Sequence, residues 1–278
     1  MSETQSFLCP RCGKLISRYL AECSHCGLVE PYRQYRLRKA LRLPSLVKAL
    51  IWLCGGLFGL SFLLPLLLGG SIQMGRGMLG LPAPSGYALH LMGWATTDHL
   101  IRGEYYPLVT AVFLHGGLLH IIFNMLWLRD LGRLTEQIFN PAVMLTLFVV
   151  TGVAGNLLAV SMPFVWASMG MSARPVAVLG ASGAVFGLMG ALIAFSRKLP
   201  SFQARTLARQ LGTWAIVIIL LGFMMPQVSN AGHIGGFVAG WALGKLLPVR
   251  VKRPHLFDLM GLASAGLVVY SFAQVALR

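Results

Sequence analysis

The residues best suited to chemistry lie in a glycine-rich turn at the start of an apolar segment. The stretch Gly180-Ala-Ser-Gly183 places the hydroxyl of Ser182 between glycines, and His233 stands further along, within Asn230-Ala-Gly-His-Ile-Gly-Gly236. Both neighbourhoods are apolar enough to enter a membrane, where polar side chains are costly unless they have a function. A hydroxyl and an imidazole that meet in such a place are typical of a nucleophile and its base.

A second polar group lies in the segment that runs from His115 to Asn124. His120 and Asn124 are four residues apart, so both side chains lie on one face of a helix and can donate hydrogen bonds to one point. Taken alone, a histidine and an asparagine in a membrane helix are as well explained by hydrogen bonds between helices. Together with a serine and a histidine elsewhere at matching depth, they favour a catalytic site.

Composition indicates a polytopic membrane protein. Hydrophobic residues make up 56% of the 278 residues and charged residues only 11%, whereas a soluble globular protein has about 25% charged residues. A membrane-crossing helix needs ~20 mainly apolar residues. Seven segments approach that length: 46–68, 117–135, 141–161, 182–197, 211–227, 229–247 and 256–277. We expect an all-α membrane domain.

The net charge of +15 is explained by topology. With the N-terminus in the cytoplasm, every Lys and Arg falls on the cytoplasmic side except Arg76, Arg102, Arg174 and Arg278. Such an asymmetry predicts a cytoplasmic N-terminus and a C-terminus outside. The alternative, contact of the run from Arg33 to Lys48 with lipid headgroups or nucleic acid, is not needed to explain the charge. We expect no nucleic-acid partner.

This topology also predicts where the polar residues lie in the bilayer. The second, fourth and sixth spans all run from the outer to the inner side, and their polar residues come early in each span. Ser182, His233, His120 and Asn124 therefore share the depth of the outer leaflet. Four scattered polar residues would rarely coincide in this way, so we expect one site.

Glycine spacing predicts which spans pack together. Gly183 and Gly187 are four apart in the fourth span, and the sixth span carries an unbroken four-residue repeat of glycines. Such repeats let helix backbones approach closely in lipid. We expect the fourth and sixth spans to pack face to face and to bring Ser182 within hydrogen-bond reach of His233. Ordinary helix packing without catalysis would use the same glycines, which in the sixth span are Gly232, Gly236, Gly240 and Gly244.

The first residues form a different unit. Cys9-Pro-Arg-Cys12 and Cys23-Ser-His-Cys26 are two CxxC pairs, each followed by a glycine. Four thiolates at this spacing suit a tetrahedral structural zinc ion. The alternatives are disulfides or a redox dithiol, which a cytoplasmic location disfavours, and His25 in place of one cysteine. Cys54, in the first span, is expected to be a packing residue.

The domain organisation follows from these patterns. We expect a zinc-ribbon head over residues 1–32, a basic linker over 33–45, a membrane domain over 46–247, and a basic cytoplasmic loop with an additional helix over 248–278. The long segment 69–116 is expected to be an outer loop with short interfacial helices. A head this small needs its metal to fold, and docking of a cytoplasmic partner suits it better than catalysis.

At these motifs the chain resembles the rhomboid family of intramembrane serine proteases over about residues 46–247. The resemblance implies a six-helix core with a Ser182–His233 dyad that opens to the outer side, to which this chain adds a seventh helix and the ribbon. His115, Gly180, Gly183 and Gly236 are the supporting residues of the matching motifs. One departure concerns the first loop, where the family often carries Trp-Arg and this chain has Tyr106-Pro107, which leaves the bracing of that loop to be explained.

The sequence thus predicts a serine endopeptidase of a bacterial inner (plasma) membrane that cleaves peptide bonds in or near transmembrane helices of its substrates. Ser182 would attack, His233 would act as base, and the Ser182 backbone N–H, His120 and Asn124 would hold the oxyanion, with no carboxylate to complete a triad. A non-proteolytic helper that binds membrane-protein clients is the main alternative. A transporter is disfavoured because neither an inverted repeat nor an intramembrane carboxylate accompanies the polar residues.

Overall fold

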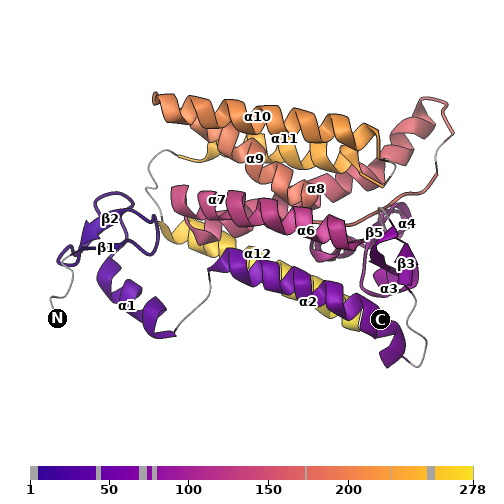
Figure 1. Ribbon diagram of the computed structural model, residues 1–278, viewed down its shortest axis with the longest axis horizontal. Helices are drawn as coiled ribbons and strands as arrows, with labels where there is room; N and C mark the ends of the chain where they lie inside the picture. Colours follow the sequence, from indigo (N-terminus) through magenta and orange to yellow (C-terminus); the bar gives the residue numbers. More distant parts are fainter. Residues whose placement is uncertain are drawn as a thin grey trace.

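The computed structural model describes residues 6–41, 45–68, 74–76, 80–172, 174–225, 227–248 and 254–277. Long helices lie side by side, with a small N-terminal unit at one end of the bundle and a group of short elements at the other (Figure 1). The described chain begins with β1 in the N-terminal unit, and α12 ends near the opposite end of the bundle.

Each of the seven predicted spans contains a helix. The helices α2, α8, α10 and α12 are each long and apolar enough to cross a membrane, and the pair Pro107–Phe113 and Leu118–Ile138, bent by 89°, passes the same test together. This confirms a mainly helical, multi-pass membrane fold. The bounds are α2 Leu46–Leu67, α6 Leu118–Trp127, η3 Leu128–Gly132, α7 Arg133–Ile138, α8 Pro141–Ser168, α9 Ser182–Ser196, α10 Phe202–Phe223, α11 Asn230–Leu246 and α12 Pro254–Ala276.

Two of the predicted span boundaries are wrong by seven residues or more. α8 continues seven residues beyond the predicted end, to Ser168, and α10 begins at Phe202, nine residues before the predicted start. In α10 the cause is visible, because Arg205 and Arg209 interrupt the apolar pattern although they lie in the first helical turns. Side-chain caps mark the true starts, with Ser201 accepting from the Ala204 N–H and Ser229 accepting from the Gly232 N–H, the arrangement that favours serine at an N-cap.

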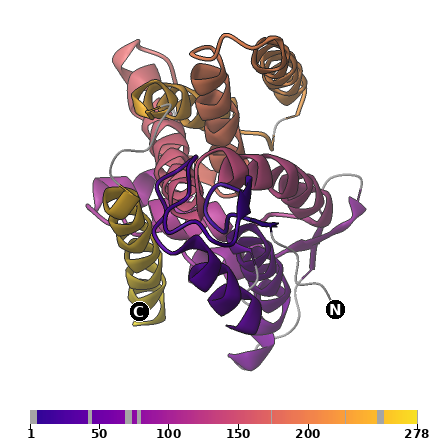
Figure 2. The ribbon, with the colours of Figure 1, turned by 90° about the vertical axis from the view of Figure 1, so that its left-hand side faces the viewer.

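The helix α9 is the centre of the bundle. Every residue from Gly183 to Ser196 is buried, and α9 packs against α8, α10 and α11. Figure 2, which views the bundle from the end of the N-terminal unit, shows α12 on the periphery, where it packs against α8. The serine at the start of α9 is therefore fixed by the most enclosed helix of the fold.

The first loop is built of short elements, as the sequence predicts. The strand β5 pairs antiparallel with β6, with Ala95 opposite Val178, and so ties this loop to the segment that leads into α9. The other described elements are β3 Met74–Arg76 paired with β4 Pro82–Pro84, α3 Gly86–Leu91, β5 Ala95–Thr96, α4 Thr97–Ile101, α5 Pro107–Thr110, η2 Ala111–Phe113 and β6 Ala177–Val178.

The N-terminal unit is a hairpin with a helix against it. The strand β1 (Ser6–Leu8) pairs antiparallel with β2 (Leu15–Ser17), and α1 (Pro31–Leu41) follows. Tyr32 of α1 packs edge-on against Phe7 at a centroid distance of 5.3 Å, so α1 runs from the head into the predicted linker. Residues 42–44 of that linker and 249–253 of the predicted basic loop lie outside the described residues. The head contacts the membrane domain through Arg11, which is buried and lies 3.8 Å from the Asp258 carboxylate.

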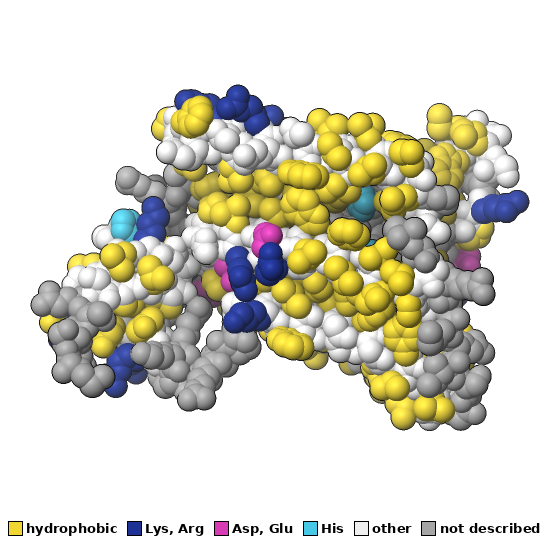
Figure 3. Space-filling view, in the orientation of Figure 1, with side chains coloured by type: hydrophobic (Ala, Val, Ile, Leu, Met, Phe, Trp, Pro, Cys, Tyr) yellow, Lys and Arg dark blue, Asp and Glu magenta, His cyan; other side chains and the backbone are white. Residues whose placement is uncertain are grey.

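The surface matches the predicted asymmetry of charge. Figure 3 shows apolar side chains over α2, α6 and α10, with most Lys and Arg side chains towards the end of the bundle where the N-terminal unit lies. An apolar belt with basic side chains gathered at one end is the distribution expected of a protein that spans a membrane.

Candidate active site

The helices α9 and α11 touch through their backbones. A Cβ at Gly236 would overlap the carbonyl of Gly183, and a Cβ at Gly240 would overlap that of Gly187. The third contact of the ridge repeats the pattern, with Gly244 against Ala191. The close packing predicted from glycine spacing is therefore confirmed, and a side chain at any of these positions would separate the two helices.

This contact brings the two predicted catalytic residues to one place. Ser182 is the first residue of α9 and directly precedes Gly183, and Gly232 of α11 directly precedes His233. A Cβ on Gly183 would lie 3.3 Å from the Gly232 carbonyl oxygen. The ring of His233 stacks on Phe186 with centroids 4.4 Å apart and planes 10° apart. Phe186 is one turn after Ser182, on the same face of α9. The imidazole thus lies beside the turn that carries the serine.

The orientation of His233 comes from an aromatic ring. Its Nδ1 is buried and has no hydrogen-bond partner among the described residues. The hydrogen bond from Ser182 Oγ to His233 is not formed within that part of the chain either, and such catalytic hydrogen bonds often tighten only when substrate binds. That bond stays a prediction. Sequence analysis missed Phe186, although its spacing of four from Ser182 is a usable signal.

His120 contacts the turn before Ser182 from the other side. Its Nδ1 accepts a hydrogen bond from the Gly116 N–H at 3.4 Å, which leaves the proton of a neutral ring on Nε2. A Cβ at Gly180 would lie 2.6 Å from that Nε2. Gly180 also has φ +123°, a backbone conformation that disfavours other residues. Glycine is therefore needed here both for its backbone and for the space that His120 occupies.

The turn itself is held by backbone hydrogen bonds. Gly180 lies two residues after the end of β6, and its N–H donates to the Ala111 carbonyl at 2.8 Å. The first loop and η2 therefore fix the position of the turn. This connection between segments about seventy residues apart follows from no local pattern, which is why sequence analysis did not find it.

Asn124 and His115 support His120. The Asn124 Nδ2 donates to the His120 carbonyl at 2.8 Å, and the buried His115 ring packs edge-on against His120 at 5.2 Å. One N–H of the Asn124 amide remains beyond that bond. The two ring nitrogens of His115 have no hydrogen-bond partner among the described residues, so the contact of this side chain with His120 is a ring contact.

The helix α8 packs against both α9 and α11. A Cβ at Gly155 would overlap the Gly232 carbonyl, and the Asn156 side chain donates to the Leu108 carbonyl at 2.9 Å. These residues were also missed by sequence analysis. A lone asparagine in an apolar span was the available signal for Asn156.

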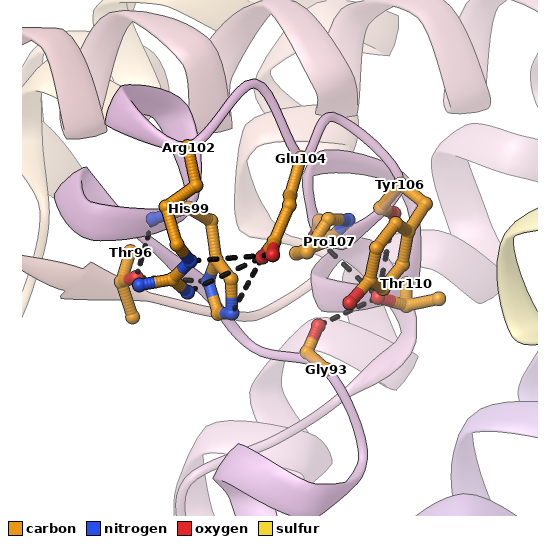
Figure 4. Close-up of polar contacts among 8 residues, drawn as sticks. All are labelled: Gly93, Thr96, His99, Arg102, Glu104, Tyr106, Pro107 and Thr110. Carbon is orange, nitrogen blue, oxygen red and sulfur yellow. Dashed lines mark hydrogen bonds and ion pairs between the residues drawn. The ribbon is translucent and has the colours of Figure 1, made fainter. Parts of the chain in front are cut away.

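The first loop has its own bracing in place of the Trp-Arg pair (Figure 4). Arg102 donates two hydrogen bonds of 3.2 Å to the Glu104 carboxylate, whose Oε2 lies 3.8 Å from Nε2 of the buried His99. The His99 Nδ1 lies 2.8 Å from the Thr96 hydroxyl. Further along, Thr110 donates to the Gly93 carbonyl at 2.6 Å. These contacts tie α4 to the turn at Glu104 and α5 to the turn at Gly93, without an arginine at position 107.

The four predicted metal ligands form one cluster. The sulfur atoms of Cys9, Cys12, Cys23 and Cys26 all lie within 4.8 Å of one another, and two of the pairs are 3.8 Å apart. A disulfide needs about 2.05 Å, whereas a tetrahedral site with Zn–S bonds of about 2.3 Å has sulfur–sulfur edges of about 3.8 Å. A hydrogen bond from the Cys26 thiol lowers the pKa of Cys9 to about 5, so a thiolate is favoured there. The donor set and its dimensions fit a metal ion.

Comparison with known proteins identifies the membrane domain. The Rhomboid domain family matches residues 102–250, which is more than half of the chain and contains every residue of the polar site. The chain belongs to the rhomboid family. This rhomboid is 34% identical over 148 residues to Rhomboid protease GluP of Bacillus subtilis, an alignment that covers 51% of this chain and 26% of that protein.

Two eukaryotic relatives give a similar picture. RHOMBOID-like protein 5 of Arabidopsis thaliana is 33% identical over 180 residues, which cover 63% of this rhomboid and 55% of that protein. Rhomboid-like protease 3 of Toxoplasma gondii is 29% identical over 165 residues, which cover 58% of each. The chain spans between about a quarter and somewhat more than half of the length of these curated relatives. Family membership and fold follow from these matches.

Proposed function

We propose that this rhomboid is an intramembrane serine endopeptidase that hydrolyses peptide bonds in or near the transmembrane helices of membrane-protein substrates. One observation carries the proposal. The backbone contact of α9 with α11 places the His233 ring on Phe186, one turn from Ser182, while His120 approaches the same turn at Gly180. A nucleophile, a base and a hydrogen-bond donor then converge in a protein whose relatives include named rhomboid proteases.

The reaction proceeds by acyl transfer. His233 takes the proton of Ser182 Oγ as the oxygen attacks the carbonyl carbon, and the C=O electron pair moves onto the carbonyl oxygen. When the tetrahedral intermediate collapses, the C–N bond breaks and His233 protonates the leaving amine. His233 then takes a proton from water as the water oxygen attacks the acyl carbon, the bond from that carbon to Ser182 Oγ breaks, and His233 returns the proton to Ser182 Oγ.

Three donors are available for the oxyanion. The Ser182 N–H belongs to the first residue of α9, where backbone N–H groups have no partner within the helix and the helix dipole favours negative charge. The His120 Nε2–H, whose tautomer is set by the Gly116 N–H, is the second donor. The free N–H of the Asn124 amide is the third. Removal of one such donor typically slows an enzyme about 100- to 1,000-fold.

The base works in a dyad. Neither α9 nor α11 contains a carboxylate, and the described partner of the His233 ring is Phe186, on which it stacks. Flat stacking and burial in an apolar helix pair fix the plane of the imidazole. We therefore assign Phe186 the task of fixing the plane of the imidazole, which is one part of what an aspartate does in a triad.

The remaining assignments concern the whole protein. We propose zinc as the ion held by Cys9, Cys12, Cys23 and Cys26, with a structural role because four protein ligands leave no open position. We further propose the four-part division at residues 32, 45 and 247, a cytoplasmic N-terminus, an outer C-terminus and a bacterial plasma membrane, in line with the basic residues at the ribbon end (Figure 3). A cytoplasmic partner of the ribbon would dock on its exposed face.

The proposal is tested with purified full-length protein in liposomes that also hold a single-span fusion substrate. The wild type is expected to cut the substrate and Ser182→Ala to leave it intact. Ser271→Ala, which removes a hydroxyl of α12 bonded to the Leu267 carbonyl, is the matched control and should retain activity. Binding of the substrate without cleavage by folded wild type would instead favour the non-proteolytic helper.

A further inference from the structure

Three arginines line a pocket where α9 ends and α10 begins. The pocket has a volume of about 460 Å³ and is lined by Arg197, Phe202, Arg205, Ala208 and Arg209. Arg205 and Arg209 are four residues apart and share one face of α10, while Arg197 is the C-cap of α9. The three guanidinium groups therefore come from two helices and surround one hollow.

Within the described residues, no carboxylate balances the positive charge of this pocket. None of the three arginines forms an ion pair with a carboxylate in the part of the chain that the structure describes. The pocket also lies at the N-terminal end of a 22-residue helix with no acidic residue in its first turn. A helix N-terminus carries positive partial charge and is destabilised by cations, so this arrangement favours a bound anion.

The neighbouring lysine has a different task. Lys198 donates hydrogen bonds to the carbonyls of Lys245 and Leu247 at the end of α11. It thereby fastens α11 to the end of α9. The Lys198 ammonium group is therefore bonded to backbone carbonyls, whereas the three arginines remain available to bind a ligand.

The pocket lies between polar and apolar surface. α10 qualifies as a membrane span, so its first turn lies at the boundary between apolar and polar surface. Phe202 is 66% exposed at that boundary, and Trp214, Ile216 and Leu220 are exposed further along the helix. Figure 3 shows Lys and Arg side chains at the start of α10 beside the apolar surface. A ligand with an anionic head and apolar chains matches both parts.

We propose that this pocket binds a phosphate ester group, supplied by an anionic phospholipid whose acyl chains lie along α10. Arginine forks bind phosphate oxygens with paired hydrogen bonds, and three of them exceed the charge of one phosphodiester. The site is independent of Ser182 and of the proposed protease activity.

Native mass spectrometry of the full-length protein tests this inference. Phosphatidylglycerol and phosphatidylcholine with identical acyl chains are titrated separately, and inorganic phosphate is titrated in a third arm. The pocket variant is Arg205→Gln with Arg209→Gln. The control is Arg133→Gln, which removes an exposed arginine outside the pocket. Unfolding midpoints of all variants are measured alongside, and single Arg205→Gln replaces the pair if the pair does not fold.

We expect phosphatidylglycerol to bind more tightly than phosphatidylcholine and the pocket pair to weaken it about 30-fold, since each basic residue near an anionic headgroup contributes about fivefold. Arg133→Gln should bind like the wild type. Arginine-dependent binding of inorganic phosphate without a lipid preference would keep the phosphate site and assign it to a soluble ligand. Equal binding of both lipids without any phosphate binding, or equal loss in the pocket pair and the control, would overturn the proposal.

Discussion

The α9–α11 contact and the N-terminal ribbon are stabilised in opposite ways. In the first, helix backbones touch because glycines leave no side chains between them, as at Gly236 against Gly183 and Gly240 against Gly187. In the ribbon, the buried apolar side chains other than the cysteines are Phe7, Ile16 and Leu28. A core that small does not hold a fold without cross-links or a metal.

The comparison shows which parts of the molecule tolerate change. The helix contact fails when an atom is added, because no space exists for it. With the proposed metal bound, the ribbon should fail when a cysteine ligand is removed, because its three buried apolar side chains cannot replace the ion. The first loop lies between these extremes, since its contacts are polar, partly exposed and spread over several side chains.

The largest effect is expected from adding a side chain to the glycine ridge. Gly240→Leu should separate α9 from α11 and abolish both folding and activity, because insertion of bulk into a packed contact costs about 1–3 kcal/mol or more and here meets backbone. Gly59→Leu is the matched control, since a Cβ at this exposed position of α2 meets nothing within 4 Å. Thermal unfolding in detergent distinguishes them, and a Gly240→Leu protein as stable as the wild type would show that the helices do not touch.

Loss of the metal should affect the ribbon alone. Cys12→Ser should abolish metal binding and expose the amides of residues 6–30 to rapid hydrogen exchange, because folding of such sites depends on the ion. Cys54→Ser, at a buried cysteine outside the cluster, should keep one metal per chain. Exchange in α9 and α11 should be unchanged in both variants. Metal bound normally by Cys12→Ser would refute the four-cysteine site.

A smaller effect is expected from the ring that positions the base. Phe186→Ala should lower kcat roughly tenfold with little change in KM. Without the ring, the imidazole of His233 is no longer held in the orientation that proton transfer requires. Phe186→Tyr keeps the ring and should restore kcat. Equal losses in the two variants would mean that Phe186 serves packing and not orientation.

The smallest effect is expected in the loop. Glu104→Gln removes the partner of Arg102, whose side chain is half exposed, so solvent screens the pair and its contribution should be small. A double-mutant cycle with Arg102→Ala should give a coupling in cleavage rate of less than about fivefold. A coupling several times larger would mean that this pair replaces the missing arginine at position 107 energetically as well as structurally.

Much of the membrane domain could be predicted from sequence because its determinants are local. Apolar length located the seven helices, and the four-residue spacing of glycines predicted the α9–α11 contact that the structure confirms. The start of α10 was misplaced because Arg205 and Arg209 are helical but not apolar. Hydropathy predicts where the apolar part of a helix begins. The helix itself begins earlier, at its N-cap Ser201.

The parts that escaped prediction depend on distant residues. The bond from Gly180 to Ala111 and the contacts among Arg102, Glu104 and His99 arise from the path of the chain, and charged residues in a loop carry no periodicity that would reveal them. Phe186 was missed because an aromatic residue in a span is usually explained by lipid contact. Only the position of His233 gives it a role.

The most direct test of the central claim is covalent labelling of Ser182 by a fluorophosphonate, read by mass spectrometry of the modified peptide. The account predicts an adduct on Ser182 in the wild type, loss of the adduct in His233→Ala, and its retention in the control Ser271→Ala. Labelling of Ser182 that is equally strong without His233, or no labelling of the folded wild type, would contradict a serine activated by the histidine that α11 brings to α9.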